Sequence, residues 1–218
     1  MYHSPTIVIG FHGCDASIVE RVLLGDQLLP SKNVYDWLGH GIYFWEGSYD
    51  RALRWANKNP DVKNPAVLGA ILRLGNCLDL LDTEHTQTVR ETYELLKKEL
   101  SALGMPLPSN TITDKNGISF NRELDCMVIL RLHKFISDSI RDELGDNWPR
   151  SSRAQKRAIQ NHPTFIDSIR GMFPEGDALY PEAGFREKNH IQLCITNPNC
   201  VIGYFMPSQQ DTMYKQLA

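Results

Sequence analysis

The apolar and polar positions divide the chain into strands near both ends and helices in the middle. Thr6–Phe11 is an almost continuous apolar run, typical of a buried strand, and it leads into His12-Gly13 at the expected strand end. His190–Thr196 alternates apolar and polar residues, which predicts a half-buried strand. Because Asn197-Pro198-Asn199 is a turn sequence, we expect Cys200–Met206 to pair back on that strand.

Two short helices are expected in the first third of the chain, each following a residue that can cap its start. Asp15 precedes the first helix, which ends at Gly25, and Ser48 precedes the second. The apolar segments Val67–Leu74 and Cys77–Leu81 then predict two further strands.

The middle of the chain has the spacing of apolar residues that is typical of helices. Glu84–Leu103 repeats apolar positions at intervals of three and four, and Gly104 ends it. Pro106–Gly117 is expected to be a loop, and Leu124–Leu144 and Trp148–Gln160 are expected to be helical.

These elements predict an α+β fold in one domain over residues 1–218, with a helical insertion over about residues 82–161. Consecutive strands joined by a short turn imply an antiparallel sheet. A length of 218 residues fits one domain with an insertion, and 42% hydrophobic with 22% charged residues is a globular composition.

Charge and cysteine content exclude several classes of protein. The net charge of −3 disfavours a generally basic, DNA-coating protein. The chain does not begin with a basic segment followed by an apolar run, so we expect no signal peptide. No apolar run approaches the ~20 residues that cross a bilayer, so we expect no membrane-spanning segment and no membrane partner. The five cysteines are dispersed and lack CxxC spacing, which predicts a cytoplasmic protein without a metal site.

Three segments carry candidate chemistry. His12-Gly13 offers an imidazole beside a bare backbone, and Gly39–Trp45 places two glycines among aromatic residues that suit a flat ligand. Phe185–Thr196 brings Glu187, His190 and Gln192 to a strand. Taken singly, each segment also fits a structural role: a strand-to-turn junction, an aromatic core or a solvated edge strand.

Together the three segments resemble the ADP-ribosyltransferase superfamily, in its His-Tyr-Glu branch of poly(ADP-ribose) polymerases and diphtheria toxin. His12-Gly13 matches the His-Gly motif of that branch, and Gly39–Phe44 matches its Gly-x-Gly-[Ile/Leu]-Tyr-Phe segment. Arg51–Ala56 is similar to the helix that follows, and Gln192–Ile195 matches the strand bearing the catalytic Glu. The resemblance is absent from the middle of the chain.

The resemblance implies antiparallel split β-sheets around a cleft for NAD, which is the substrate, and no metal. It implies that His12 hydrogen-bonds the adenosine ribose and that Gly13 offers its backbone N–H and C=O to the nicotinamide amide. Tyr43 would stack on the nicotinamide ring. Gly41 would also line the cleft, and Tyr49 or Trp55 would supply a second aromatic wall.

The candidate catalytic residues depart from the family. Gln192 matches the position of the catalytic Glu, and a carboxamide can hydrogen-bond a hydroxyl but cannot act as a base. This favours mono-ADP-ribosylation over polymer elongation, with Glu187 as the reserve carboxylate. Phe173–Asn189 would then be the acceptor-recognition loop, with polar candidates that include Arg170, Glu175 and Arg186.

The expected function is therefore a mono-ADP-ribosyltransferase that modifies a protein or a nucleic acid, such as RNA. A bacterial toxin or antiphage effector held by an antitoxin would suit a small chain. An NAD glycohydrolase, a non-catalytic NAD- or ADP-ribose-binding module, and a thiol hydrolase using Cys14 beside His12 are the alternatives. The basic residues of Arg150–Arg157 form either a face that binds nucleic-acid phosphates or a helix face that is only solvated.

Overall fold

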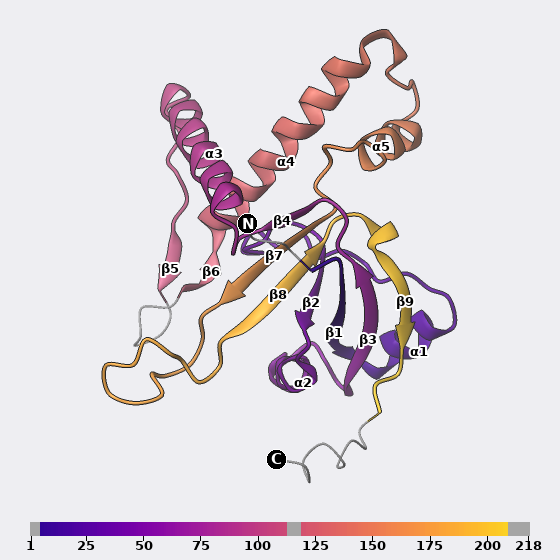
Figure 1. Ribbon diagram of the computed structural model, residues 1–218, viewed down its shortest axis with the longest axis vertical. Helices are drawn as coiled ribbons and strands as arrows, with labels where there is room; N and C mark the ends of the chain where they lie inside the picture. Colours follow the sequence, from indigo (N-terminus) through magenta and orange to yellow (C-terminus); the bar gives the residue numbers. More distant parts are fainter. Residues whose placement is uncertain (1–4, 113–118, 209–218) are drawn as a thin grey trace.

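The fold is α+β, built on a seven-stranded sheet in a computed structural model that describes residues 5–112 and 119–208 (Figure 1). The strand order is β4-β7-β8-β2-β1-β3-β9. The strands are β1 (Ile7–Asp15), β2 (Ile42–Glu46), β3 (Pro65–Arg73), β4 (Cys77–Asp79), β7 (Ser168–Phe173), β8 (His190–Ile195) and β9 (Val201–Phe205). Neighbouring strands are antiparallel except β4 and β7, which run parallel.

Two short helices cover the half of the sheet that contains β1 and β3. Helix α1 (Ala16–Leu23) begins where the Asp15 carboxylate accepts the Ser17 N–H, as the cap prediction required. It packs Val19 and Val22 into the core. Helix α2 (Tyr49–Lys58) packs Ala52 on the sheet.

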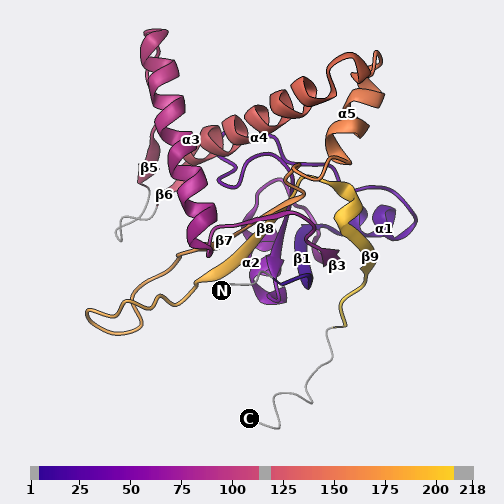
Figure 2. The ribbon, with the colours of Figure 1, turned by 45° about the horizontal axis from the view of Figure 1, so that its top comes forward.

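The segment between β4 and β7 contains most of the helical residues. It comprises α3 (Thr83–Ala102), the antiparallel pair β5 (Asn110–Ile112) and β6 (Ser119–Arg122), α4 (Glu123–Leu144) and α5 (Ser152–Gln160). Helix α4 packs Ile129 and Leu132 against β7 and β8. Helices α3 and α4 diverge from a common base, and α5 lies beyond the far end of α4 (Figures 1 and 2).

A buried ion-pair cluster joins three strands across the sheet. The Arg170 guanidinium donates to Glu46 at 2.7 Å and to Asp79 at 3.1 Å. Asp79 has no exposed surface, and Arg170 is 7% exposed. Because a buried charge must be paired to be tolerated, these ion pairs are a structural reason for Arg170, which the sequence offered as a polar candidate for acceptor recognition.

Four sequence predictions about the elements were wrong. Residues Cys200–Met206 do not pair with β8, since β2 and β7 occupy both its edges; they form β9, which pairs with β3. His12-Gly13 lies inside β1, because pairing with β3 continues to Asp15. Strand β5 falls within the expected loop 106–117, whose residues 113–117 lie outside the described residues. Ser48 makes no side-chain hydrogen bond to the α2 N-terminus.

No described helix is both long and apolar enough to cross a membrane. All five cysteines are free and buried. Within residues 5–112 and 119–208, no group of three His, Cys, Asp or Glu side chains could hold a metal ion.

Candidate functional site

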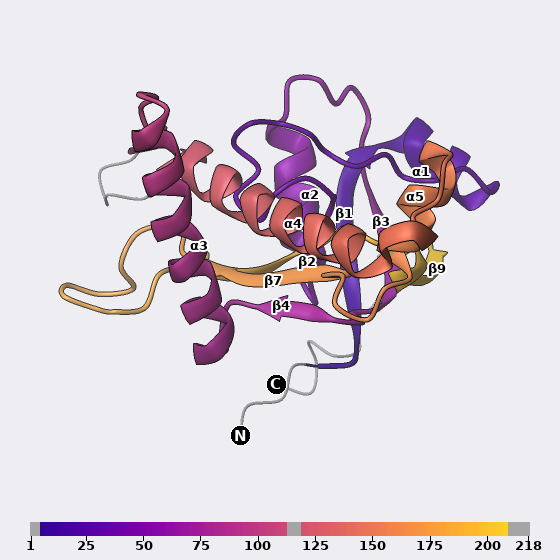
Figure 3. The same cartoon turned by 90° about the horizontal axis from the view of Figure 1, so that it is seen from above.

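Three distant motif segments lie on the adjacent strands β1, β2 and β8. Phe11 pairs with Trp45 across β1 and β2, and Trp45 pairs with Gln192 across β2 and β8. Tyr43 pairs with Cys194 on the same two strands. The sheet therefore brings the His-Gly, Gly-x-Gly-Ile-Tyr-Phe and Gln192 segments together at its centre, as Figure 1 shows for the strands that carry them. Seen from above, α4 lies over the half of the sheet that contains β7 (Figure 3).

The candidate side chains leave the sheet on two faces. Paired residues point to the same side of a sheet, so Tyr43 and Gln192 share the face of Trp45. His12 follows Phe11 and therefore points to the other face, where its ring centroid is 5.7 Å from that of Phe44. The imidazole thus approaches Tyr43 from the opposite side of the sheet rather than from beside the phenol.

His12 contacts β2 through its side chain instead of through the strand ladder. Its Nδ1 lies 2.7 Å from the carbonyl oxygen of Tyr43, which can only accept a hydrogen bond. Nδ1 therefore carries a proton. Burial lowers the pKa of His12, so the ring is neutral at neutral pH and Nε2 is left as a hydrogen-bond acceptor.

A local gap in the β1–β2 ladder begins at this histidine. The Ile9 carbonyl accepts the Gly47 N–H, so alternate residues of β1, including Gly13, direct their backbone groups toward β2. The ladder ends at the pair of Phe11 and Trp45, and His12 takes the Tyr43 carbonyl that the next ladder bond would have used. The Gly13 N–H and C=O therefore face the gap.

The bare Cα of Gly13 is also required by helix α2. A Cβ at Gly13 would lie 2.2 Å from the backbone oxygen of Ala52. The close packing of α2 is therefore a sufficient physical reason for glycine here, whether or not a ligand uses the backbone groups.

The Tyr43 hydroxyl is held by the loop before β2. It donates to the Gly39 carbonyl at 2.8 Å and accepts the Leu38 N–H at 3.0 Å, and burial raises the pKa of Tyr43 well above its usual value. Gly39 has φ of +76°, which favours glycine, and a Cβ at Gly41 would lie 2.5 Å from the Cys194 sulfur. Gly39 thus suits the turn that holds the tyrosine hydroxyl, and Gly41 lets the chain approach β8 closely.

Gln192 is oriented by two neighbours. Its Oε1 accepts the Trp37 indole N–H at 2.6 Å, and its Nε2 lies 3.2 Å from Nε2 of His190. His190 Nδ1 in turn donates to the Lys188 carbonyl at 2.8 Å. Because burial lowers the pKa of His190, its Nε2 accepts from the Gln192 amide. A carboxylate in place of Gln192 would lack that donor, so the surroundings favour glutamine.

Aromatic side chains surround Gln192. The ring of Phe173 stacks on His190 with centroids 5.4 Å apart, and Trp45 lies 5.8 Å from Trp55. Trp55 is 44% exposed, which leaves it accessible as an aromatic wall. Tyr49 instead packs edge-on against Phe11 at 5.9 Å.

Glu175 is a carboxylate that contacts this cluster, through His190. The Glu175 side chain forms an ion pair with Arg51, and its Oε2 lies 4.0 Å from Nδ1 of His190. Glu187 is exposed in the β7–β8 connection, where its N–H donates to the Asp177 carbonyl. The sequence indicated Glu175 only as a polar residue of the loop. Its partner Arg51 is 124 residues away, so no local pattern predicts the ion pair.

The proposed thiol nucleophile is unsuited to that role. Cys14 is buried, and burial raises the pKa of its thiol to about 11. Since the thiolate is the reactive form, the structure opposes the thiol hydrolase alternative.

Buried histidines predict that acid destabilises the fold. Burial lowers the pKa of His133 to about 4, and within the described part of the chain its Nε2 has no hydrogen-bond partner. Below the unfolded value of about 6.5 the unfolded chain binds a proton that the folded chain refuses, so this contribution is complete above pH 6.5 and is lost toward pH 4. Denaturant unfolding should give a free energy lower at pH 5 than at pH 7.5, with His133 accounting for about 1–2 kcal/mol.

The control for this prediction is His133→Leu, which removes the titrating group. Its unfolding free energy should change less between the two pH values than that of the wild type. An unchanged pH dependence would assign the effect to other groups, such as the buried His12 and His190.

Comparison with known proteins gives a relative but no function. The chain is 25% identical to an uncharacterized protein of Methanocaldococcus jannaschii over 212 residues, which cover 88% of this chain and 83% of the relative. No family model matches the chain. No solved structure matches it either.

Proposed function

We propose that the protein is an NAD-dependent mono-ADP-ribosyltransferase with the ADP-ribosyltransferase fold that its motifs resemble. The observation that supports this most is the gap between β1 and β2, which the Gly13 backbone groups face and where a neutral His12 contacts the Tyr43 carbonyl. A paired N–H and C=O match the amide of nicotinamide. The free His12 Nε2 accepts a hydrogen bond from a ribose hydroxyl.

The reaction that suits these groups breaks the bond between nicotinamide and ribose. The bonding electron pair goes to the pyridinium nitrogen, so nicotinamide leaves as a neutral molecule and positive charge develops on the ribose. The nucleophilic atom of the acceptor bonds to the anomeric carbon and loses its proton to solvent. The protein has mainly to bind and orient NAD.

Gln192 would contribute a hydrogen bond to the nicotinamide ribose rather than a charge. Its carboxamide is already held by Trp37 and His190, so it can orient a hydroxyl without rearrangement. The absence of a base at this position favours a single transfer to an acceptor that is already nucleophilic. Glu187 remains the alternative if the β7–β8 connection closes over bound NAD.

Labelled NAD incubated with the protein and a cell lysate tests the proposal. We expect release of nicotinamide and label on a macromolecule, and digestion by protease, ribonuclease or deoxyribonuclease then identifies the acceptor class. Gln192→Ala should lower the rate about tenfold because one orienting hydrogen bond is lost. A larger loss in Glu187→Gln than in Gln192→Ala would transfer the role to Glu187.

Other results of the same assay would support the alternatives. Free ADP-ribose without labelled macromolecule would indicate an NAD glycohydrolase. Thermal stabilisation by NAD or ADP-ribose without release of nicotinamide would indicate a binding module. The free cysteines suit a cytoplasmic location, and an inhibitory antitoxin would be sought as a protein that blocks nicotinamide release.

A further inference from the structure

Helix α5 and the residue pair before it carry positive charge without any acidic residue. Four side chains contribute: Arg150, Arg153, Lys156 and Arg157. All four are exposed, and residues 148–161 contain no Asp or Glu. The helix lies outside the sheet, beyond the far end of α4 (Figure 1).

These cations lack the ion pairs that neutralise others on nearby helices. Arg131 pairs with Glu99, and Lys134 pairs with Asp138 at 2.8 Å. Among residues 5–112 and 119–208, no salt bridge joins any of these four cations to a carboxylate. Near the end of α4, Glu143 Oε1 lies 3.4 Å from Nε2 of His162, which follows α5.

The spacing of the cations opposes helix stability. Arg153 is followed by Lys156 three residues later and by Arg157 four residues later, so like charges are neighbours on the helix surface. Each such pair costs a few tenths of a kcal/mol in an isolated helix. The arrangement is therefore better explained by an anionic partner than by the needs of the helix.

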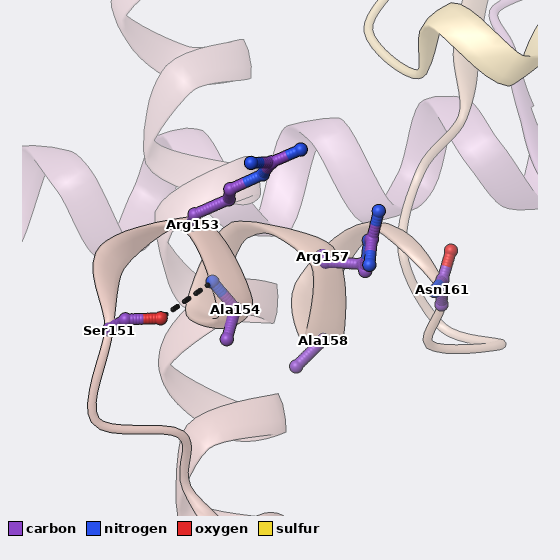
Figure 4. A pocket seen from close by; sticks show the side chains of 6 residues that line it. All are labelled: Ser151, Arg153, Ala154, Arg157, Ala158 and Asn161. Atoms are coloured by element: carbon purple, nitrogen blue, oxygen red, sulfur yellow. Dashed lines mark hydrogen bonds between the residues drawn. The ribbon is translucent and has the colours of Figure 1, made fainter.

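A shallow, open depression lies along one side of this helix. Arg153 and Arg157 line an open space of about 380 Å³ together with Ser151, Ala154, Ala158 and Asn161. Figure 4 shows both arginine side chains extending from the same side of the helix. Their Cα atoms are separated by about 6 Å along the axis, so the two guanidinium groups can contact neighbouring phosphates of one strand.

We propose that α5 and Arg150 bind the sugar–phosphate backbone of a nucleic acid. Guanidinium groups bind phosphate oxygens in pairs, and a nucleic-acid strand presents a regular row of phosphates to the several cations of this surface. The exposed side chains of α5 include no large apolar residue, whereas a helix that lies on a membrane inserts an apolar face. The inference uses no residue of the proposed NAD site and does not depend on it.

Fluorescence anisotropy with labelled nucleic acids of about 20 nucleotides tests this site across roughly 50–200 mM salt. Single-stranded RNA, duplex RNA and duplex DNA distinguish the source of the phosphates. We expect binding that weakens linearly on a log–log plot against salt. The double variant Arg153→Glu with Arg157→Glu should weaken it at least about tenfold, since two phosphate contacts become repulsive.

The matched control is Lys97→Glu with Lys98→Glu on α3, which changes the net charge equally at exposed positions. Its affinity should stay close to that of the wild type. Arg153→Gln with Arg157→Gln should reduce the salt slope by roughly 1.4–1.8, and this milder variant guards against loss of the helix. Circular dichroism verifies equal helix content.

Three results would overturn the proposal. One is the absence of salt-dependent binding by the wild type to all three nucleic acids. Another is an equal loss of affinity in the α5 variants and the α3 control, which would indicate attraction by overall charge only. The third is tighter binding of the wild type to phosphatidylserine vesicles than to any of the three nucleic acids.

Discussion

Replacing Arg170 with Met should lower the free energy of unfolding by about 3–5 kcal/mol, because it leaves the Asp79 carboxylate buried without its cation. Met is unbranched and fills much of the same volume, so the loss would come from charge more than from packing. A typical domain has only about 5–15 kcal/mol of stability, so this variant should unfold at much lower denaturant concentration. Urea unfolding followed by circular dichroism measures the change.

A second substitution separates charge from packing in this experiment. Arg170→Met combined with Asp79→Leu removes both buried charges and should recover a large part of the lost stability. Glu46→Gln should cost less than Arg170→Met, since the Glu46 side chain is 20% exposed and reaches solvent. A loss below about 1 kcal/mol in Arg170→Met would mean that water or a shifted side chain replaces the guanidinium.

Helices whose ends are decided by residues close in the sequence were predictable from the sequence. Helix α1 begins at the Asp15 cap and is followed by Gly25 in the left-handed region, as predicted. The predicted helix Glu84–Leu103 differs from α3 by one residue at each end, and its start is capped by Asp82. Local capping and apolar spacing decide both helices, so a single sequence contains the needed information.

Strand partners were less predictable, because alternation identifies a strand without identifying its neighbour. The turn at Asn197-Pro198-Asn199 suggested that the following strand returns to β8. Instead this strand crosses to β3, since both edges of β8 are occupied, and Cys200 packs into the core there. The continuation of β1 through His12-Gly13 likewise depends on β3, which is distant in sequence.

In the candidate site, too, the motif residues were predictable and their distant partners were not. The motifs indicated His12, Tyr43 and Gln192, and the sheet brings their three strands together. No pattern indicated the Trp37 indole as the partner of Gln192, because 155 residues separate them. The sequence also could not indicate that His12 and Tyr43 project on opposite faces, since that depends on the register between β1 and β2.

His12→Asn should lower the rate of nicotinamide release by about 100-fold while leaving the protein folded. The Asn amide can still donate to the Tyr43 carbonyl, which His12 Nδ1 now occupies, so the contact between β1 and β2 is preserved. The shorter side chain has no group at the position of Nε2. The variant therefore removes only the acceptor that the proposed function assigns to the ribose.

His12→Gln is the matched variant, because its longer amide reaches toward the position of Nε2 and should retain more activity than Asn. Thermal unfolding with and without NAD measures binding independently of turnover, and His12→Asn should reduce the stabilisation by NAD. Full turnover in a folded His12→Asn protein would contradict the role of His12. A wild type that neither releases nicotinamide nor is stabilised by NAD would instead reject the NAD site itself, because the gap between β1 and β2 would then have only a structural role.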